Sequence, residues 1–269
     1  MVTPTKEETA MYLAAAAAGN SACLSRQVGA SITDKNGEVI GIGWNDVPKS
    51  NGGVYQFDSN DSLGQNDHRC LNLHGGVCFN DHEKKVIRDL IVNKLIDDEK
   101  LVDEKNRERL TEILKTSRIK ELIEFSRAVH AEMHAIIQAS QKAGHRVLEG
   151  KLFCTTYPCH NCARHIVVSG IKEVYYIEPY RKSLAIRLHS DSITEDESNK
   201  DRVRILMYDG VSPDSYNLFF KMESNSRKLN GKKLSIPKKE STPKRMISLQ
   251  AIPILEKTVT DTLHTKQLI

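Results

Sequence analysis

The pattern of apolar and polar positions along the chain predicts helices in some segments and strands in others. Residues 6–22 are rich in alanine and follow a polar N-terminal stretch, which predicts a helix. Apolar runs at 28–33 and 38–44 predict two strands, and the Asn36-Gly37 pair between them is a strong signal for a hairpin turn. The start of the chain therefore predicts a helix followed by a β-hairpin.

The second half of the chain alternates expected helices with expected strands. These are a helix at about 128–142 that ends before Gly144, a strand at 151–155, a helix at 159–169, a strand at 173–177 and a last strand at 203–208. Such alternation is typical of an α/β protein with three layers, in which a sheet lies between helices.

Between these two regions the pattern changes twice. Residues 45–82 are rich in Gly, Asn and Asp and show little periodicity, as a long functional loop does. Residues 83–125 are charged and carry apolar residues at helical spacing. We therefore expect an insertion at about 46–125 within a domain at 1–225, and a flexible basic tail at 226–269, where Lys, Ser and Pro dominate.

Charge narrows the range of partners. The chain has a formal net charge of +4, but residues 226–269 hold ten Lys or Arg against three Asp or Glu. The first 225 residues are therefore mildly acidic, which makes a nucleic acid an unlikely substrate. The basic tail is expected to be solvated.

Cellular location is indicated by what the sequence does not contain. No apolar run reaches the roughly 18 residues that span a membrane. The N-terminus has no basic stretch followed by an apolar one, so we expect a cytoplasmic protein without membrane association. Its six cysteines then favour metal binding or burial over disulfides.

Two short segments carry the chemistry. His130-Ala131-Glu132 and Pro158-Cys159-His160-Asn161-Cys162 match the H-x-E and P-C-x-x-C signature of zinc deaminases. A lone C-x-x-C would also fit a zinc knuckle or a redox pair. The helical His-x-Glu and the preceding proline favour the deaminase type of site.

The spacing explains how these residues would work together. Cys159 and Cys162 share one face of a helical turn, and the positive end of that helix stabilises their thiolates. His130 supplies a third ligand for Zn²⁺ and leaves a fourth position open, where zinc lowers the pKa of a water towards about 7. Glu132 would then move a proton from that water to the substrate.

At these segments the chain resembles deoxycytidylate deaminases. The resemblance rests on residues 25–30, 41–45, 130–137 and 155–162. It covers about 7–45 and 126–180 and implies a fold like that of cytidine deaminases, with a three-layer α/β/α arrangement around a mixed sheet.

Other segments resemble the deaminase half of bacterial anti-phage dCTP deaminases. These are 45–49, the Gly52-Gly53 loop, the helical insertion, 178–183 and 210–213. That comparison covers most of 7–225 and implies depletion of deoxycytidine nucleotides during phage infection. A P-loop kinase-like domain usually precedes the deaminase in those proteins, and its G-x-x-x-x-G-K-[ST] motif does not occur here.

The resemblance also implies roles for residues of the substrate pocket. Asn45 would hydrogen-bond the sugar 3′-hydroxyl and Tyr180 would pack against the base. Thr155 and Tyr157 would line the same pocket. Charge alone adds Arg26, Lys49 and Arg69 as candidates for phosphate binding, although each has the alternative of an ordinary surface charge.

A second metal site is a separate hypothesis. Cys70, His74, Cys78 and His82 form a dense group of soft ligands that could close around a structural zinc. The alternative is a polar loop with buried cysteines.

Taken together, the sequence predicts a zinc-dependent deaminase that converts dCTP or dCMP into the deoxyuridine nucleotide and ammonia. We expect a homo-oligomer that binds a small deoxynucleotide. No regulatory partner can be identified. Two alternatives stay open: deamination of cytosine or adenosine in a polynucleotide, and a non-catalytic, zinc-stabilised subunit of a defence complex.

Overall fold

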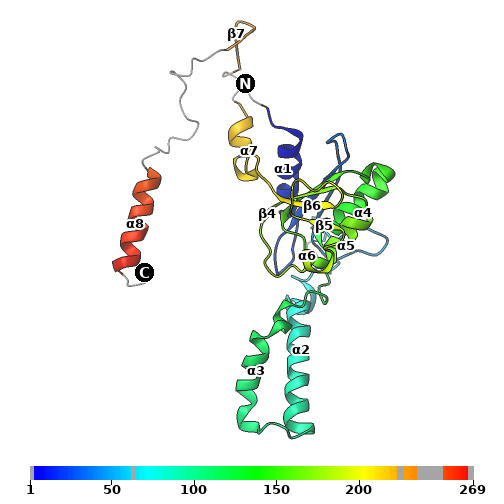
Figure 1. Cartoon of the computed structure of the whole chain (residues 1–269), viewed down its shortest axis with the longest axis vertical. Helices are drawn as coiled ribbons and strands as arrows, with labels where there is room; N and C mark the ends of the chain where they lie inside the picture. The colour runs from blue at the N-terminus through cyan, green and yellow to red at the C-terminus, as the bar shows by residue number, and fades with distance from the viewer. Residues whose placement is uncertain (1–2, 62–64, 223–226, 235–250, 266–269) are drawn as a thin grey trace. The chain divides into compact units, whose positions relative to one another are not determined.

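The computed structural model describes residues 3–61, 65–222, 227–234 and 251–265. Its contacts divide the chain into two compact units, Met1–Tyr216 and Asn217–Ile269. The first unit contains the sheet, its covering helices and the insertion (Figure 1). This division falls slightly before the expected boundary after residue 225.

A six-stranded mixed sheet forms the centre of the first unit. In spatial order its strands are β2 (Val39–Trp44), β1 (Gly29–Thr33), β3 (Lys151–Thr156), β4 (Glu173–Glu178), β6 (Val203–Met207) and β5 (Ile193–Thr194). Strand β1 runs antiparallel to β2 and β3, while β3, β4, β6 and β5 run parallel to one another. The expected mixed sheet is confirmed.

Helices cover both faces of this sheet. They are α1 (Lys6–Ala18), α4 (Ala131–Ala143), α5 (His160–Val168) and α6 (Ala185–Leu188). Helix α7 covers Pro213–Phe220, and the ring of its Tyr216 stacks on Tyr12 of α1. A 3₁₀ turn, η5 (Gly144–Val147), follows α4 directly. The three-layer α/β/α architecture is therefore confirmed.

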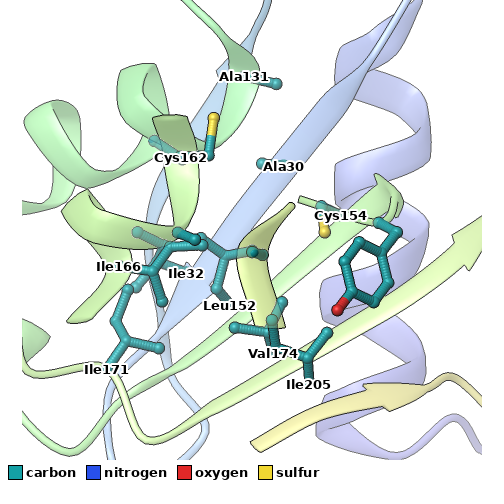
Figure 2. Packing of buried hydrophobic residues seen from close by; sticks show 14 of the residues in the cluster. Ala30, Ile32, Ala131, Leu152, Cys154, Cys162, Ile166, Ile171, Val174 and Ile205 are labelled. Carbon is teal, nitrogen blue, oxygen red and sulfur yellow. The ribbon is translucent and has the colours of Figure 1, made fainter. Parts of the chain in front are cut away.

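Strand β3 shows how the layers are separated, because side chains along a strand alternate between its two faces. Phe153 joins Met11 and Ala14 in the core beneath α1. Leu152 and Cys154 belong to the larger core on the opposite face, together with residues of α4 and α5 such as Ile166 (Figure 2). The larger core lies beneath α4 and α5, whose N-terminal ends contain the two sequence motifs.

Two glycines of β2 determine how closely α4 can approach the sheet. A Cβ atom at Gly41 would lie 2.7 Å from the carbonyl oxygen of Ala135, which is closer than a van der Waals contact. A Cβ at Gly43 would collide with the backbone of Ala131 and Ala135. Glycine at both positions therefore lets α4 pack directly on β2.

The insertion lies between β2 and α4. It contains η1 (Leu73–Gly75), α2 (Phe79–Asn93), a π-helical turn η2 (Lys94–Asp98), η3 (Glu104–Asn106), α3 (Arg107–Thr116) and η4 (Arg118–Glu121). Helices α2 and α3 lie side by side as a hairpin (Figure 1). Arg107 holds the far end of this hairpin through hydrogen bonds to Asn93, Asp97 and Glu104. The helical insertion is confirmed, although its first helix begins within the expected loop.

The second unit contains more regular structure than the sequence suggested. Strands β7 (Lys228–Leu229) and β8 (Lys232–Lys233) form a small antiparallel ribbon, and α8 covers Ala251–Thr265. No helix among the described residues is both long and apolar enough to cross a membrane.

Candidate metal centre and substrate cavity

Three side chains from two helix N-termini form a compact group. His130 is the residue that caps α4, Cys159 caps α5, and Cys162 lies in the first turn of α5. The Nδ1 atom of His130 lies 3.3 Å from the sulfur of Cys159 and 3.3 Å from that of Cys162. All three potential ligand atoms lie within 4.8 Å of one another.

The local backbone explains why these side chains converge. Strand β3 ends at Thr156, and the buried Pro158 precedes the start of α5. The amide of Cys162 donates a 3.5 Å hydrogen bond to the sulfur of Cys159, as an N-terminal helix turn allows. Val129, paired with Asp46 in a short antiparallel bridge, brings His130 to the same place.

Electrostatics favour the metal-binding thiolate form at Cys159, whereas burial raises the pKa of the Cys162 thiol. The hydrogen bond with Cys162 lowers the pKa of Cys159 to about 4, with His130 acting in the same direction against the effect of burial. Burial alone would lower the pKa of His130, but the hydrogen bond with Cys159 and its charge raise it to about 9. Two thiols and one imidazole are a donor set typical of zinc. The residues present therefore fit Zn²⁺.

Glu132 lies beside this group. It is the second residue of α4 and its side chain is only 4% exposed. Burial raises its pKa, the negative charge of Cys159 raises it further, and His130 acts in the opposite direction. A buried carboxyl with a raised pKa next to a metal site is suited to proton transfer near neutral pH.

The group formed by His130, Cys159 and Cys162, called the metal group below, lies at the wall of a cavity of about 570 Å³. The protein body contributes His130, Glu132, Cys159, Asn45, Tyr157 and Tyr180 to its walls. The insertion contributes Asn80, Asp81, Lys84, Lys120 and Ile123. A volume of this size is in the range of pockets that hold small ligands.

Most of the predicted substrate residues line this cavity. Asn45 is buried, and its amide accepts from the Val28 amide at 2.8 Å and donates to the Arg26 carbonyl at 2.8 Å. The hydroxyl of Tyr157 donates to Glu195 at 2.9 Å, and burial raises the pKa of Tyr180. These contacts hold the loop and the rings in place around the cavity.

Strand β3 supplies a different threonine from the one expected. Thr156 lines the cavity, whereas the hydroxyl of Thr155 accepts a hydrogen bond from the amide of Gly29 at 3.2 Å. Adjacent residues of a strand point to opposite faces, so only one of the two can face the cavity.

The three cations selected by charge have different surroundings. Arg26 lines the cavity and forms a 3.1 Å ion pair with Glu178. Arg69 is buried and bound to Asp67 at 2.6 Å, and it lies outside the cavity wall, as does the exposed Lys49.

The hypothesis of a second zinc stays a prediction. Cys70 is buried, which raises the pKa of its thiol, while the sulfur of Cys78 lies 3.3 Å from the Ser25 hydroxyl. The side chain of His74 lies outside the described ones. Among the side chains that are described, the only group of three or more potential ligands is His130, Cys159 and Cys162.

Sequence reasoning missed the residues that the insertion brings to the cavity. Asn80 and Lys84 are separated by one helical turn, so they share a face of α2. Nothing in the local pattern indicates that this face returns to the catalytic helices. The polar i, i+4 pair beside apolar positions was the only signal available.

Comparison with known proteins agrees with this geometry. Residues 4–178 match the family model of the cytidine and deoxycytidylate deaminase zinc-binding region. The deoxycytidylate deaminase of Enterobacteria phage T4 is 28% identical over 184 residues, which are 66% of this chain and 80% of the phage protein.

Two further proteins are similar to this chain, and they match different fractions of its length. ComE operon protein 2 of Bacillus subtilis (strain 168) is 45% identical over 56 residues, or 21% of this chain and 29% of that protein. A solved structure of the dCMP deaminase from cyanophage S-TIM5, in complex with dCMP and dUMP, has a TM-score of 0.43 and 20% identity. The match covers 77% of this chain and all of the cyanophage chain.

The fold and the donor set define a metal-binding α/β protein of the deaminase type. The family model identifies the family within this class, because it matches more than half of the chain and includes both motifs. The chain belongs to the cytidine and deoxycytidylate deaminase family.

Proposed function

We propose that this protein hydrolyses the exocyclic amine of a free deoxycytidine nucleotide, giving the deoxyuridine nucleotide and ammonia. The observation that carries the proposal is the position of Glu132. Its buried carboxyl lies next to the His130, Cys159 and Cys162 group, at the wall of a cavity large enough for a nucleotide. A purely structural metal site needs no such carboxyl, which disfavours the non-catalytic alternative.

The residues have separate tasks in this reaction. His130, Cys159 and Cys162 would hold Zn²⁺, which when bound acidifies a water at its open position. Glu132 accepts a proton from the attacking water and delivers it to the ring nitrogen as the oxygen adds to the carbon that carries the amine. Glu132 then moves the second proton to the amine, the C–N bond breaks and ammonia leaves.

The cavity walls position the substrate for this transfer. Tyr180 and Val28 offer apolar surface for the base, and Tyr157 is fixed by its bond to Glu195. Asn45 hydrogen-bonds the sugar, because its amide retains hydrogen-bonding capacity beyond the bonds to Arg26 and Val28. Burial of these groups strengthens each polar contact with the substrate.

Three observations support a free nucleotide as the substrate. The phage T4 and T2 relatives are deoxycytidylate deaminases. Asn45 would bond a 3′-hydroxyl that a polynucleotide esterifies, and the mildly acidic first 225 residues disfavour a long nucleic acid. The use of dCTP as well as dCMP and a role in anti-phage defence, within the cytoplasm, rest on the sequence resemblance and belong to the proposal.

The test is a product assay. The purified, zinc-loaded protein is incubated separately with deoxycytidine, dCMP, dCTP and a single-stranded oligonucleotide that contains cytosine, and products are separated by chromatography. We expect deoxyuridine nucleotides from free nucleotides and no deaminated cytosine in the oligonucleotide. Equal rates on oligonucleotide and free nucleotide would instead support the polynucleotide alternative.

A further inference from the structure

The helical insertion forms one wall of the substrate cavity. Asn80 and Lys84 reach it from α2, and Lys120 reaches it from η4. Four cations line the cavity, since Arg26 and Lys182 join Lys84 and Lys120. Among the described lining residues, Asp81 and Glu132 are the carboxylates. Arg26 is paired with Glu178, so the remaining positive charge lies on the three lysines. Catalysis on a cytosine ring does not require this charge.

Lys84 is the most buried of these cations. It is 8% exposed, and its ammonium group donates to the carbonyl oxygen of Lys120 at 3.2 Å. Asp81 lies 3.6 Å away, beyond a good hydrogen bond, and its side chain is 75% exposed. A lysine ammonium has three donors, so Lys84 keeps donors for another acceptor. Buried ammonium groups normally have close anionic partners.

Asn80 stands one helical turn before Lys84 and supports the same wall. Its side-chain nitrogen donates to the carbonyl oxygen of Leu122 at 3.1 Å. Its side-chain oxygen is buried and has no hydrogen-bond partner among the described residues. This oxygen is a hydrogen-bond acceptor, so it does not itself bind an anion, and the role of Asn80 in the wall is carried by its bond to Leu122.

These contacts also fix the position of the wall. Lys84 and Asn80 bind the main chain at 120–122, where the insertion returns to the protein body. Ile123, directly after this segment, packs against the large core. The start of α2 is therefore joined to the segment at 120–122, and this base of the α2–α3 hairpin is anchored on the domain that carries the metal group.

We propose that this wall binds the phosphate of the nucleotide substrate, with Lys84 as the direct contact and Lys120 beside it. The inference rests on the proposed function and assigns the insertion a task within it. The ion pair of Lys84 with Asp81 at 3.6 Å is long, so a phosphate supplies a closer anionic acceptor, and a charge-assisted hydrogen bond is among the stronger polar contacts. Asn80 is a positioning residue that holds the carbonyl of Leu122.

The experiment compares substrates that differ only in phosphate. Lys84→Gln is measured with deoxycytidine, dCMP and dCTP. We expect kcat/KM for the nucleotides to fall by about tenfold to a hundredfold more than for deoxycytidine, mainly through KM, as loss of a charged hydrogen bond implies. Comparing dCMP with dCTP shows whether the wall contacts the first phosphate or a later one.

Matched variants separate binding from folding. Lys85→Gln changes the neighbouring exposed lysine, which lies outside the cavity wall, and should behave as wild type. Lys84→Arg should recover part of the nucleotide preference because it keeps the charge. If Lys84→Gln does not fold, Lys120→Gln provides the same comparison. Equal losses on deoxycytidine and nucleotides, or no loss, would overturn the inference.

Failure of the proposed function is distinguishable from failure of this inference. If the wild-type protein deaminates none of the three compounds, the proposed function is wrong. Calorimetric titration of the wild-type protein and the Lys84→Gln variant with dCMP and with deoxycytidine then still tests the wall. Tighter binding of dCMP that depends on Lys84 supports the inference, and equal affinities overturn it.

Discussion

Glu132 combines two properties that rarely occur together in a carboxyl group. Its burial raises the pKa, so the group holds a proton at a higher pH than an exposed glutamate does. Its place on α4, two residues after His130, keeps it beside the metal ligands without its being needed as one. A group with these properties can both accept and return a proton during a single turnover.

Replacement of this carboxyl tests its role as a proton carrier. We expect Glu132→Ala to retain zinc and the fold but to lose turnover by a factor of about 10² to 10⁴, as loss of general acid–base catalysis implies. Zinc analysis, thermal unfolding and steady-state kinetics provide the measurements. Glu112→Gln, in the exposed part of α3, is the control. Wild-type turnover in Glu132→Ala would remove this residue from the mechanism.

Loss of the thiol ligands should remove the metal. We expect the Cys159→Ala, Cys162→Ala double variant to contain almost no zinc if no second site exists, because only His130 of the group is left. Cys154→Ala is a matched control, since Cys154 is a buried thiol in β3 outside the group. Metal analysis of the purified variants decides the question. Full zinc content in the double variant would contradict the ligand assignment.

The substrate side of the cavity can be tested at Asn45. Its amide holds the loop at Arg26 and Val28 as well as facing the cavity, so Asn45→Ala should weaken nucleotide turnover through both effects. The metal group is built from other residues, and zinc should therefore stay bound. Kinetics with dCMP and zinc analysis of the same preparation give the answer. Unchanged kinetics would exclude Asn45 from substrate binding.

Among the helices and strands, the sequence predicted best those whose limits depend on a few neighbouring residues. The Asn36-Gly37 turn predicts the β1–β2 hairpin because the sequence of a short turn determines its geometry. The expected helix at 128–142 instead begins at Ala131, since His130 is the extended capping residue. That shift has a chemical meaning, because the capping position directs the imidazole towards Cys159 and Cys162.

Other elements were not predictable from the local pattern. The short β5 and α6 contain too few residues to show a period. The sequence could select the three candidate ligands and Glu132 because two motifs contain them all, whereas Lys84 and Lys120 line the cavity only through the folding of the insertion. Which segments of the chain meet there is a property of the tertiary structure.

The contact between α4 and β2 provides a prediction at this scale. Gly43→Ala places a methyl group against the backbone of Ala131 and Ala135, so α4 has to move. We expect a loss of about 1–3 kcal/mol in the free energy of unfolding, as in overpacked cores, together with reduced zinc affinity. Gly19→Ala is the control, because a Cβ there makes only an ordinary contact at 3.4 Å. Denaturant unfolding measures the difference, and equal stabilities would show that α4 tolerates the shift.

At the scale of the whole molecule, the oligomeric state stays a prediction. Among the apolar residues of the insertion, Ile123 packs against the large core of its own chain. The insertion instead exposes Leu90 by 62%, Leu101 by 71% and Ile113 by 54%. Apolar side chains exposed to this extent are suited to contact with a second copy.

We expect a symmetric oligomer at micromolar concentration, measured by light scattering coupled to size exclusion. Replacement of both Leu90 and Ile113 by glutamate should shift the distribution towards the monomer, since charge at an apolar contact is costly. A variant with glutamate at the exposed Phe57, outside the hairpin, is the control. A wild-type protein that is strictly monomeric would contradict the prediction.

The way in which the insertion is joined to the domain has an evolutionary consequence. The base of the α2–α3 hairpin is held together by the contacts of Asn80 and Lys84 with residues 120–122, and its far end is closed separately by Arg107. The hairpin can therefore lengthen, shorten or be exchanged between genes while the sheet and the metal ligands keep their positions. Given the proposed role of Lys84, selection on substrate preference can act on one continuous stretch of sequence, separately from the two motifs that contain His130, Glu132, Cys159 and Cys162.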